Sequence, residues 1–244
     1  LPTTGASKAL EGFQTGRDAF VVRRLRDAGA VIIGKTNLHE LAYGITSISS
    51  MGGQTRNPYD PRRNPGGSSG GTGAAVGASF AAAGMGTDTC GSIRNPSSSQ
   101  NLVGLRGTQG LSSRDGVIPL SHTQDITGPL ARSVTDLAIM LDATAGPDPA
   151  DPVTRASAGH VPRTYISASG DSSLQDVKIG VLTNLFGAAA EDEEVAAVVR
   201  HALAAIRQLG AQVVDLTIPG YDEVMQNTSV INYAFKFDLM DFLA

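Results

Sequence analysis

The chain of 244 residues has a formal net charge of −4, and 41% of its residues are hydrophobic and 17% charged. This balance is typical of a globular protein and excludes a disordered chain, while the negative charge gives no electrostatic reason to expect nucleic acid or an anionic membrane as a partner. The single cysteine excludes an internal disulfide, no apolar run is long enough to span a bilayer and no signal peptide is visible, so we expect a cytoplasmic protein.

The first predicted elements of the chain flank Lys35. Apolar residues recur at helical spacing over 15–29, and Gly29 suits the position just after a helix. Residues 30–33 form a β-branched run, which predicts a short buried strand. A second helix is expected over 37–43. Lys35 therefore lies where a strand meets a helix, a usual place for catalytic groups in α/β proteins.

The middle of the chain alternates between loops and helices. The composition of residues 46–72 shifts to Gly, Ser, Asn and Pro, which indicates an ordered loop. Small residues over 74–84 predict a helix that can pack closely on a sheet, and residues 131–145 regain helical character. Residues 145–173 are rich in Pro, Asp, Ser and Gly, and we expect them to form a surface excursion.

The last third contains the clearest supersecondary unit. Residues 177–182 predict a strand, and residues 212–216 predict a second one. Between them, residues 191–209 predict an amphipathic helix whose acidic first turn complements the helix dipole, and Gly210 ends it. A βαβ unit of this kind normally builds a parallel sheet.

Residues 29–36 match the phosphate-loop pattern G-x-x-x-x-G-K-[ST] letter for letter. A phosphate loop needs a strand before its first glycine and free amides inside the loop. Here a helix precedes Gly29 and the interior is itself the predicted strand, so nucleotide binding is the least favoured function. His39 and Glu40 begin a zinc-protease motif, but Tyr43 stands where the second histidine belongs, and we expect no metal and no cofactor.

Two glycine loops carry serines, at residues 65–73 and 86–94. Each loop alone fits a flexible turn or an anion-binding nest. Together with the lysine at the strand end they are far more specific, and they resemble the amidase signature family, whose members hydrolyse amides with a Ser–cis-Ser–Lys triad. The resemblance covers about the first 140 residues. The matching blocks are residues 34–37, 57–60, 65–71, 86–94, 104–106 and 128–132.

The resemblance implies the catalytic residues. The family's nucleophile follows the cis-serine by 24 residues, which pairs Ser92 with Ser68 and not with Ser69. As Ser92 attacks the carbonyl carbon, its proton is implied to pass through Ser68 to a neutral Lys35. Burial beside the apolar run lowers the pKa of a lysine, as this role requires. Ser68 then returns the proton to the leaving amine.

The resemblance also implies an oxyanion hole on the second loop. It consists of convergent backbone amides where the negative charge of the reaction develops. Asp88 and Arg94 flank this loop and are expected to form a structural ion pair. The implied donors are the amides of Thr89, Cys90, Gly91 and Ser92, and further structural support is expected from Gly67, Ser69 and Gly70.

Cys90 leaves a rival mechanism open. Many relatives carry glycine at this position, and a thiolate nucleophile assisted by Lys35 and Glu40 would resemble nitrilase-type Cys-Glu-Lys enzymes. We favour a cysteine that supplies only its backbone amide, because the serine mechanism already explains the serine loops. His122 lies in a polar segment, and we interpret it as pocket wall or loop and not as a base.

The resemblance implies an α/β amidase signature fold, a mixed and mostly parallel twisted sheet covered by helices on both faces. We expect residues 1–244 to be a single amidase domain, the N-terminal part of a longer family chain, with a signature core over about 30–140 and the βαβ unit over about 177–216. The predicted function is hydrolysis of a small-molecule amide through an acyl-Ser92 intermediate. A glutaminase subunit of a tRNA amidotransferase is the main alternative. The substrate, and whether the protein forms a homodimer, are left open by the sequence.

Overall fold

The computed structural model of the protein describes residues 1–169, 173–226 and 228–244, without the side chains of residues 168 and 169. The chain folds into two compact units, Leu1–Ser167 with Val230–Ala244, and Ala168–Ser229. Residues 170–172, at the end of the predicted surface excursion, lie outside the described part. The single domain expected over 1–244 stays a prediction.

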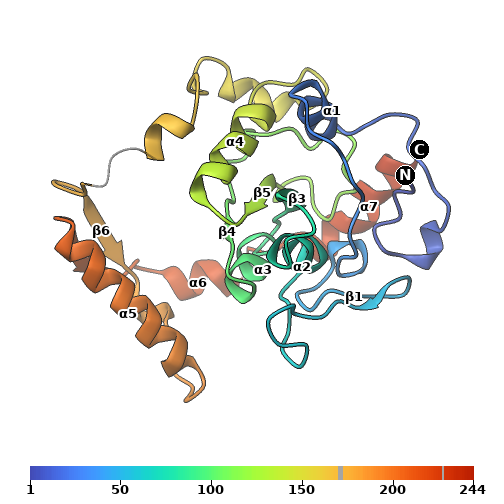
Figure 1. Cartoon of the computed structure of the whole chain (residues 1–244). Coiled ribbons are helices and arrows are strands. Elements are labelled where there is room, and N and C mark those ends of the chain that lie inside the picture. The colour runs from blue at the N-terminus through green and yellow to red at the C-terminus, as the bar shows by residue number, and fades with distance from the viewer. Residues whose placement is uncertain (170–172, 227) are drawn as a thin grey trace. The chain divides into compact units, whose positions relative to one another are not determined.

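The first unit is built on a three-stranded sheet (Figure 1). Its central strand is β5 (Thr127–Ala131), which lies between β3 (Ala83–Thr87) and β4 (Val103–Gly104). Every residue of β5 is buried, and Leu130 and Ala131 are fully so. Both pairings are antiparallel, which differs from the mostly parallel sheet expected from the sequence. Antiparallel strands need no crossover helix between them, and no helix stands between β4 and β5 in the described chain.

Helices pack against this sheet. α2 (Gly70–Gly77) packs on β3 and β5, and α4 (Val134–Thr144) packs on β5 and on α1 (Phe20–Asp27). The second serine loop therefore starts from a covered sheet, at the end of β3, and the first serine loop runs into the start of α2. The apolar cluster beneath α4 contains Ala131, Leu137 and Leu141, with partly buried Ala83, Val103, Leu105, Leu111 and Tyr165 packed around it.

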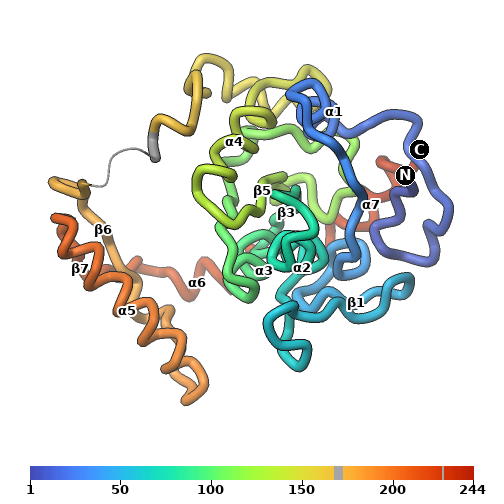
Figure 2. The backbone as a smooth tube through the Cα atoms, viewed as in Figure 1, coloured from blue at the N-terminus to red at the C-terminus, as the bar shows by residue number. Residues whose placement is uncertain are grey.

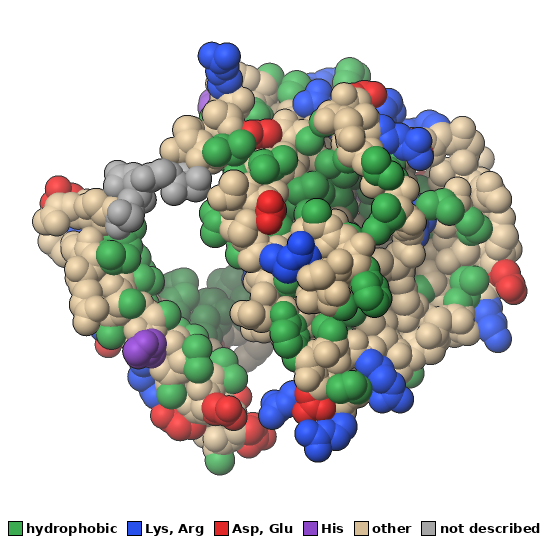
Figure 3. All heavy atoms as spheres, viewed as in Figure 1, with side chains coloured by type: hydrophobic (Ala, Val, Ile, Leu, Met, Phe, Trp, Pro, Cys, Tyr) green, Lys and Arg blue, Asp and Glu red, His purple; other side chains and the backbone are tan. Residues whose placement is uncertain are grey.

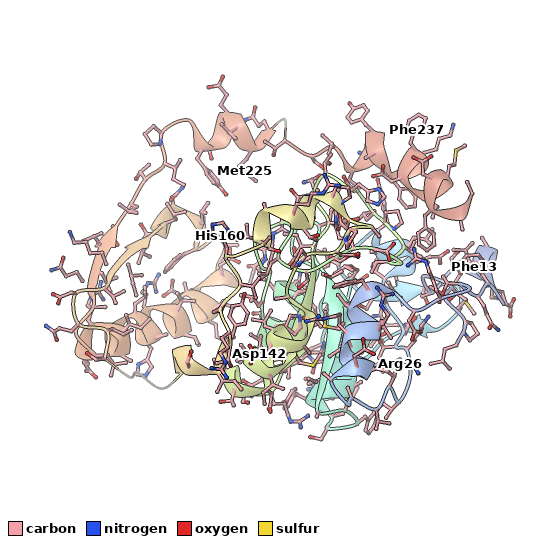
Figure 4. All side chains as sticks on the ribbon, turned by 90° about the horizontal axis from the view of Figure 1, so that it is seen from above. Phe13, Arg26, Asp142, His160, Met225 and Phe237 are labelled. Atoms are coloured by element: carbon pink, nitrogen blue, oxygen red, sulfur yellow. The ribbon has the colours of Figure 1, made fainter. Side chains whose placement is uncertain are left out.

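The two chain ends of the first unit lie side by side (Figure 2). α7 (Ile231–Leu243) brings the Phe242 ring to 6.4 Å from the Phe13 ring, measured between centroids. Phe237 on the same helix is exposed (Figure 4). The shorter elements of this unit are η1 (Lys8–Leu10), η2 (Glu40–Ala42), β1 (Ile48–Ser49), β2 (Gly53–Gln54), α3 (Arg94–Ser99) and η3 (Pro152–Ser157), and η4 (Ile166–Ser169) crosses the boundary.

The second unit contains the predicted βαβ arrangement. β6 (Lys178–Val181) pairs in parallel with β7 (Gln212–Asp215), and α5 (Asp192–Gln208) connects them, so each predicted boundary is confirmed to within one residue. The acidic first turn of α5 forms a red group at one end of the helix in Figure 3. η5 (Thr183–Leu185) and α6 (Tyr221–Gln226) complete this unit. Across the described residues, every helix is too short or too polar to cross a membrane.

Elements near the N-terminus differ from their predictions. The helix expected over 15–29 is confined to α1, and residues 37–43 contain only the short turn η2. Residues 30–33 form no strand, and the side chains of Val31 and Ile33 are 84% and 68% exposed. A β-branched run forms a strand only when a neighbouring strand completes its hydrogen bonds, and the described residues provide none there.

Gly71 offers a test of how the site is assembled. α2 begins at Gly70, four residues before the predicted start, and a Cβ on Gly71 would overlap the carbonyl oxygen of Asn37 and lie 2.8 Å from its carbonyl carbon. We therefore expect Gly71→Ala to lower the free energy of unfolding by about 1–3 kcal/mol. Urea unfolding measures this change.

Gly77 provides the matched control on the same helix. A Cβ at Gly77 meets its nearest atoms at 3.5 Å, an ordinary contact, and alanine is favoured over glycine inside a helix by about 0.8–1.0 kcal/mol. Gly77→Ala should therefore leave the stability unchanged or raise it. Equal stability of both variants would show that the close approach at Gly71 is absent in solution.

Candidate active site

The first serine loop is held by a side chain from elsewhere in the sequence. The hydroxyl of Ser47 donates to the carbonyl oxygens of Gly66 at 2.8 Å and Ser68 at 3.1 Å, and it accepts the N–H of Gly70 at 3.0 Å. Ser47 is fully buried. The peptide bond between Gly67 and Ser68 is cis, as the resemblance implies.

The neighbouring serines of this loop have different surroundings. The hydroxyl of Ser69 bonds to both backbone groups of Thr87, each at 3.3 Å, and so joins the loop to the end of β3. The hydroxyl of Ser68 is fully buried and has no hydrogen-bond partner among the described residues, a property shared there only by Ser97 Oγ and Gln100 Oε1. A buried hydroxyl without a partner costs about 1–3 kcal/mol, and such groups are often functional.

The second serine loop turns around one carboxylate. Asp88 is fully buried and accepts the N–H groups of Gly91 at 2.6 Å and Ile93 at 3.1 Å. The expected ion pair is present, since Arg94 Nε lies 3.2 Å from Asp88 Oδ2. Burial alone would raise the pKa of Asp88, but the bonds from Arg94, Ile93 and Gly91 outweigh it and hold the pKa below its usual range. Arg106, which the sequence did not single out, also bonds to the Asp88 carbonyl oxygen.

This carboxylate changes the predicted oxyanion hole. The amide of Gly91 is already donated to Asp88, so it is not available to a substrate. Within the described residues the amides of Thr89, Cys90 and Ser92 have no hydrogen-bond acceptor. Gly91 has a φ of +145°, a conformation that favours glycine, and this turn carries the chain from the side of Thr89 to that of Ser92.

The two loops touch through their backbones. The N–H of Ser69 donates to the carbonyl oxygen of Ser92 at 3.2 Å. Ser92 is 5% exposed, whereas the thiol of Cys90 is free and Cys90 is exposed. The predicted nucleophile and the predicted shuttle therefore come from directly bonded segments, which sequence spacing could only suggest.

A further buried carboxylate is hydrogen-bonded to Thr89, near the start of the second serine loop. Asp125 accepts the hydroxyl of Thr89 at 2.6 Å and the N–H groups of Leu120 at 2.8 Å and Ser121 at 2.9 Å. Burial raises the pKa of Asp125, against the opposing effect of these hydrogen bonds. Asp125 was not among the residues predicted from the sequence, where its only signal was an acidic side chain shortly before β5.

The backbone that follows Lys35 lies against the first serine loop. The hydroxyls of Thr36 and Thr72 are 2.9 Å apart, and the N–H of His39 donates to the Ser68 carbonyl oxygen at 3.0 Å. The ammonium of Lys35, in contrast, makes its hydrogen bonds to the N-terminal residues and not to this loop. It bonds to Thr3 Oγ1 and lies 3.4 Å from the carbonyl oxygen of Leu1.

The predicted base is therefore not joined to the predicted shuttle by any hydrogen bond among the described residues. Partial burial lowers the pKa of Lys35, the direction that a base requires, although the residue as a whole is exposed. The role of Lys35 as general base stays a prediction, and its contacts do not support it.

The competing interpretations find little geometric support. No helix begins at Lys35, and α1 and not a strand precedes residues 29–36, so the arrangement that a phosphate loop needs is missing from these residues. The described residues contain no group of three or more metal-binding side chains. His122 lines a pocket of about 540 Å³, together with Phe13 and Arg114, and this pocket is not lined by Ser68 or Ser92.

Comparisons with known proteins agree with the resemblance. The family model Amidase matches residues 1–243. The A subunit of the glutamyl-tRNA(Gln) amidotransferase of Gloeobacter violaceus is 45% identical over 221 residues, which are 91% of this chain and 44% of that protein. The solved structure of the native peptide amidase from Stenotrophomonas maltophilia has a TM-score of 0.89 at 40% identity, over 99% of this chain and 50% of that one.

A second solved structure has the same relation to the chain. The corresponding glutamyl-tRNA(Gln) amidotransferase subunit from Thermotoga maritima gives a TM-score of 0.87 at 34% identity, over 99% of this chain and 51% of that one. The chain thus spans about half the length of the relatives that it matches.

Proposed function

Because this chain belongs to the amidase family, we propose that the protein hydrolyses a carboxylic amide to an acid and an amine or ammonia through an acyl intermediate on Ser92. The chain has the amidase signature fold of its structural neighbours. The observation that carries the proposal is the Ser68 hydroxyl, which is buried and without a partner among the described residues, in a loop hydrogen-bonded to that of Ser92. A hydroxyl without a structural partner is free to accept the proton of Ser92 while it donates its own to a base.

In the proposed reaction the oxygen of Ser92 attacks the amide carbonyl carbon while its proton passes to the Ser68 oxygen, which gives up its own proton to a base at the same time. Collapse of the tetrahedral intermediate breaks the C–N bond, and the proton leaves with the amine. Water then attacks the acyl-enzyme, and the acid is released. The proton relay beyond Ser68 is assigned to Lys35 by the family resemblance alone.

The negative charge on the carbonyl oxygen needs hydrogen-bond donors that are in place before the reaction. We propose that the amides of Thr89, Cys90 and Ser92 supply them. The amide of Gly91 serves the loop instead, through its bond to Asp88. In this mechanism Cys90 contributes its backbone, and its thiol takes no part.

A glutaminase subunit is the second candidate. It is favoured by the 45% identity to the glutamyl-tRNA(Gln) amidotransferase subunit of Gloeobacter violaceus. The same acyl-serine chemistry would then release ammonia from glutamine for a partner to use. Glutamine as the preferred substrate, together with copurifying subunits, distinguishes this function from a free-standing amidase.

The test is a panel of amides offered to the full-length natural protein. We expect saturable release of amine or ammonia from at least one small aliphatic, aryl or peptide amide or from glutamine. ATP and GTP binding is measured on the same preparation. Failure to cleave every amide, together with tight nucleotide binding that Lys35→Ala removes, would refute the proposal and support the phosphate-loop interpretation.

A further inference from the structure

Asp125, which lies outside the loop that carries Ser92, is hydrogen-bonded to that loop through Thr89. Asp125 is 7% exposed, and its carboxylate accepts the Thr89 hydroxyl at 2.6 Å and the backbone N–H groups of Leu120 and Ser121. Thr89 is itself only 3% exposed. A short bond between two buried groups, one of them a carboxylate, is among the stronger hydrogen bonds of proteins.

The bond holds the turn at Thr89, where Arg106 also bonds to the carbonyl oxygen of Asp88, on the N-terminal side of Thr89. On the C-terminal side of Thr89, the Asp88 carboxylate accepts the N–H groups of Gly91 and Ile93. At the entry, the N–H of Asp88 donates to the Ile126 carbonyl oxygen at 2.8 Å. Two peptide planes flank Thr89, and Arg106 also holds the one between Asp88 and Thr89. The plane between Thr89 and Cys90 has no backbone hydrogen bond among the described residues, so its orientation depends most on the side-chain bond to Asp125.

These peptide planes carry two of the three amides proposed above for the oxyanion hole, those of Thr89 and Cys90. An oxyanion donor works only if it is aimed correctly before the charge develops, and a misplacement of about 1 Å can cost about 10²-fold in rate. A carboxylate that touches neither substrate nor Ser92 can therefore control the rate of the chemical step.

We infer that Asp125 is a positioning residue, which fixes Thr89 so that the amides of Thr89 and Cys90 point at the developing oxyanion. This inference rests on the proposed function. Asp125 carries out no proton transfer in it, and its bond to Thr89 acts before the substrate reacts. The expected signature is a loss in kcat with little change in KM.

The chain contains a matched control for the chemistry of this bond. Ser113 donates its hydroxyl to the buried carboxylate of Asp148 at 2.6 Å, and Asp148 also accepts the N–H of Ala150 at 3.0 Å. The bond has the same length and similar burial as that of Thr89 and Asp125, but none of the hydrogen bonds of Asp148 within the described chain reaches the loop over 88–94. Loss of this pair should affect stability alone.

The test compares Thr89→Val, Thr89→Ser, Asp125→Ala and Asp148→Ala in the full-length protein. We expect Thr89→Val and Asp125→Ala each to lower kcat by about 10²-fold with KM nearly unchanged, and Thr89→Ser to restore most of the rate because it keeps the hydroxyl. The double variant of Thr89→Val and Asp125→Ala should be no slower than either single variant, since both remove one bond. Asp148→Ala should keep the wild-type kcat.

Thermal unfolding of every variant separates folding from positioning. If Asp125→Ala does not fold, the nearly isosteric Thr89→Val decides the question. Wild-type kcat in Thr89→Val, or an equal fall of kcat in Asp148→Ala, would overturn the inference. The proposed function fails separately, when Ser92→Ala keeps its turnover, so the two failures are distinguishable.

Discussion

Ser92→Ala should abolish amide hydrolysis in the full-length protein, with kcat falling by roughly 10⁶-fold as in other serine hydrolases that lose the nucleophile. The oxygen of Ser92 is the atom that bonds to the acyl group in the proposed reaction, and alanine offers no substitute. Reaction with a fluorophosphonate probe should be lost as well. Turnover on the best amide of the panel and labelling by the probe measure both effects.

Cys90→Ala is the matched control for this prediction. The thiol is exposed two positions before the serine, so it is the nearest competing nucleophile. Because alanine keeps the backbone amide, Cys90→Ala should retain most of the activity. A dead Cys90→Ala beside an active Ser92→Ala would establish a cysteine mechanism instead.

Ser68→Ala should lower kcat by about 10²–10⁴-fold, the usual contribution of a positioned proton-transfer group. Its hydroxyl has no structural partner among the described residues, so the variant should lose little stability. Ser69→Ala is the control, since it loses the two bonds to Thr87 and should be less stable but catalytically competent. The reverse order of the two effects on kcat would move the shuttle to Ser69.

Lys35→Ala belongs to the same series. If Lys35 receives the proton from Ser68, its removal should cost as much as Ser68→Ala, with partial recovery at high pH. Its contacts with Thr3 and Leu1 lead us to expect a smaller loss. A loss equal to that of Ser68→Ala would show that the Lys35 side chain turns toward Ser68 during the reaction and acts there as a neutral amine.

Sequence patterns within a single segment predicted the elements that such segments form on their own. The bounds of the βαβ unit were predicted to within one residue, because helical periodicity marks its helix and apolar β-branched runs mark its two strands. The fold class was implied by the family resemblance and is confirmed by the structural neighbours. Residues 30–33 show the limit, since the same β-branched signal is exposed where no neighbouring strand among the described residues pairs with it.

The site shows the same division. Glycine spacing located both serine loops, and opposite charges six residues apart predicted the ion pair of Asp88 and Arg94. The groups that hold the loops, Ser47 and Asp125, come from distant segments, and no local pattern marks a polar residue that folding will bury. The direction of the Lys35 side chain was equally beyond sequence, because spacing places a backbone and not an ammonium.

The most direct test of the central claim is to locate the covalent adduct. The full-length protein is treated with a fluorophosphonate, digested with trypsin and analysed by mass spectrometry, with attention to the fragment 64–94, which contains both serine loops and Cys90. We predict a single adduct on Ser92. An adduct on Cys90, or labelling of the Ser92→Ala variant at the wild-type rate, would contradict the proposed mechanism.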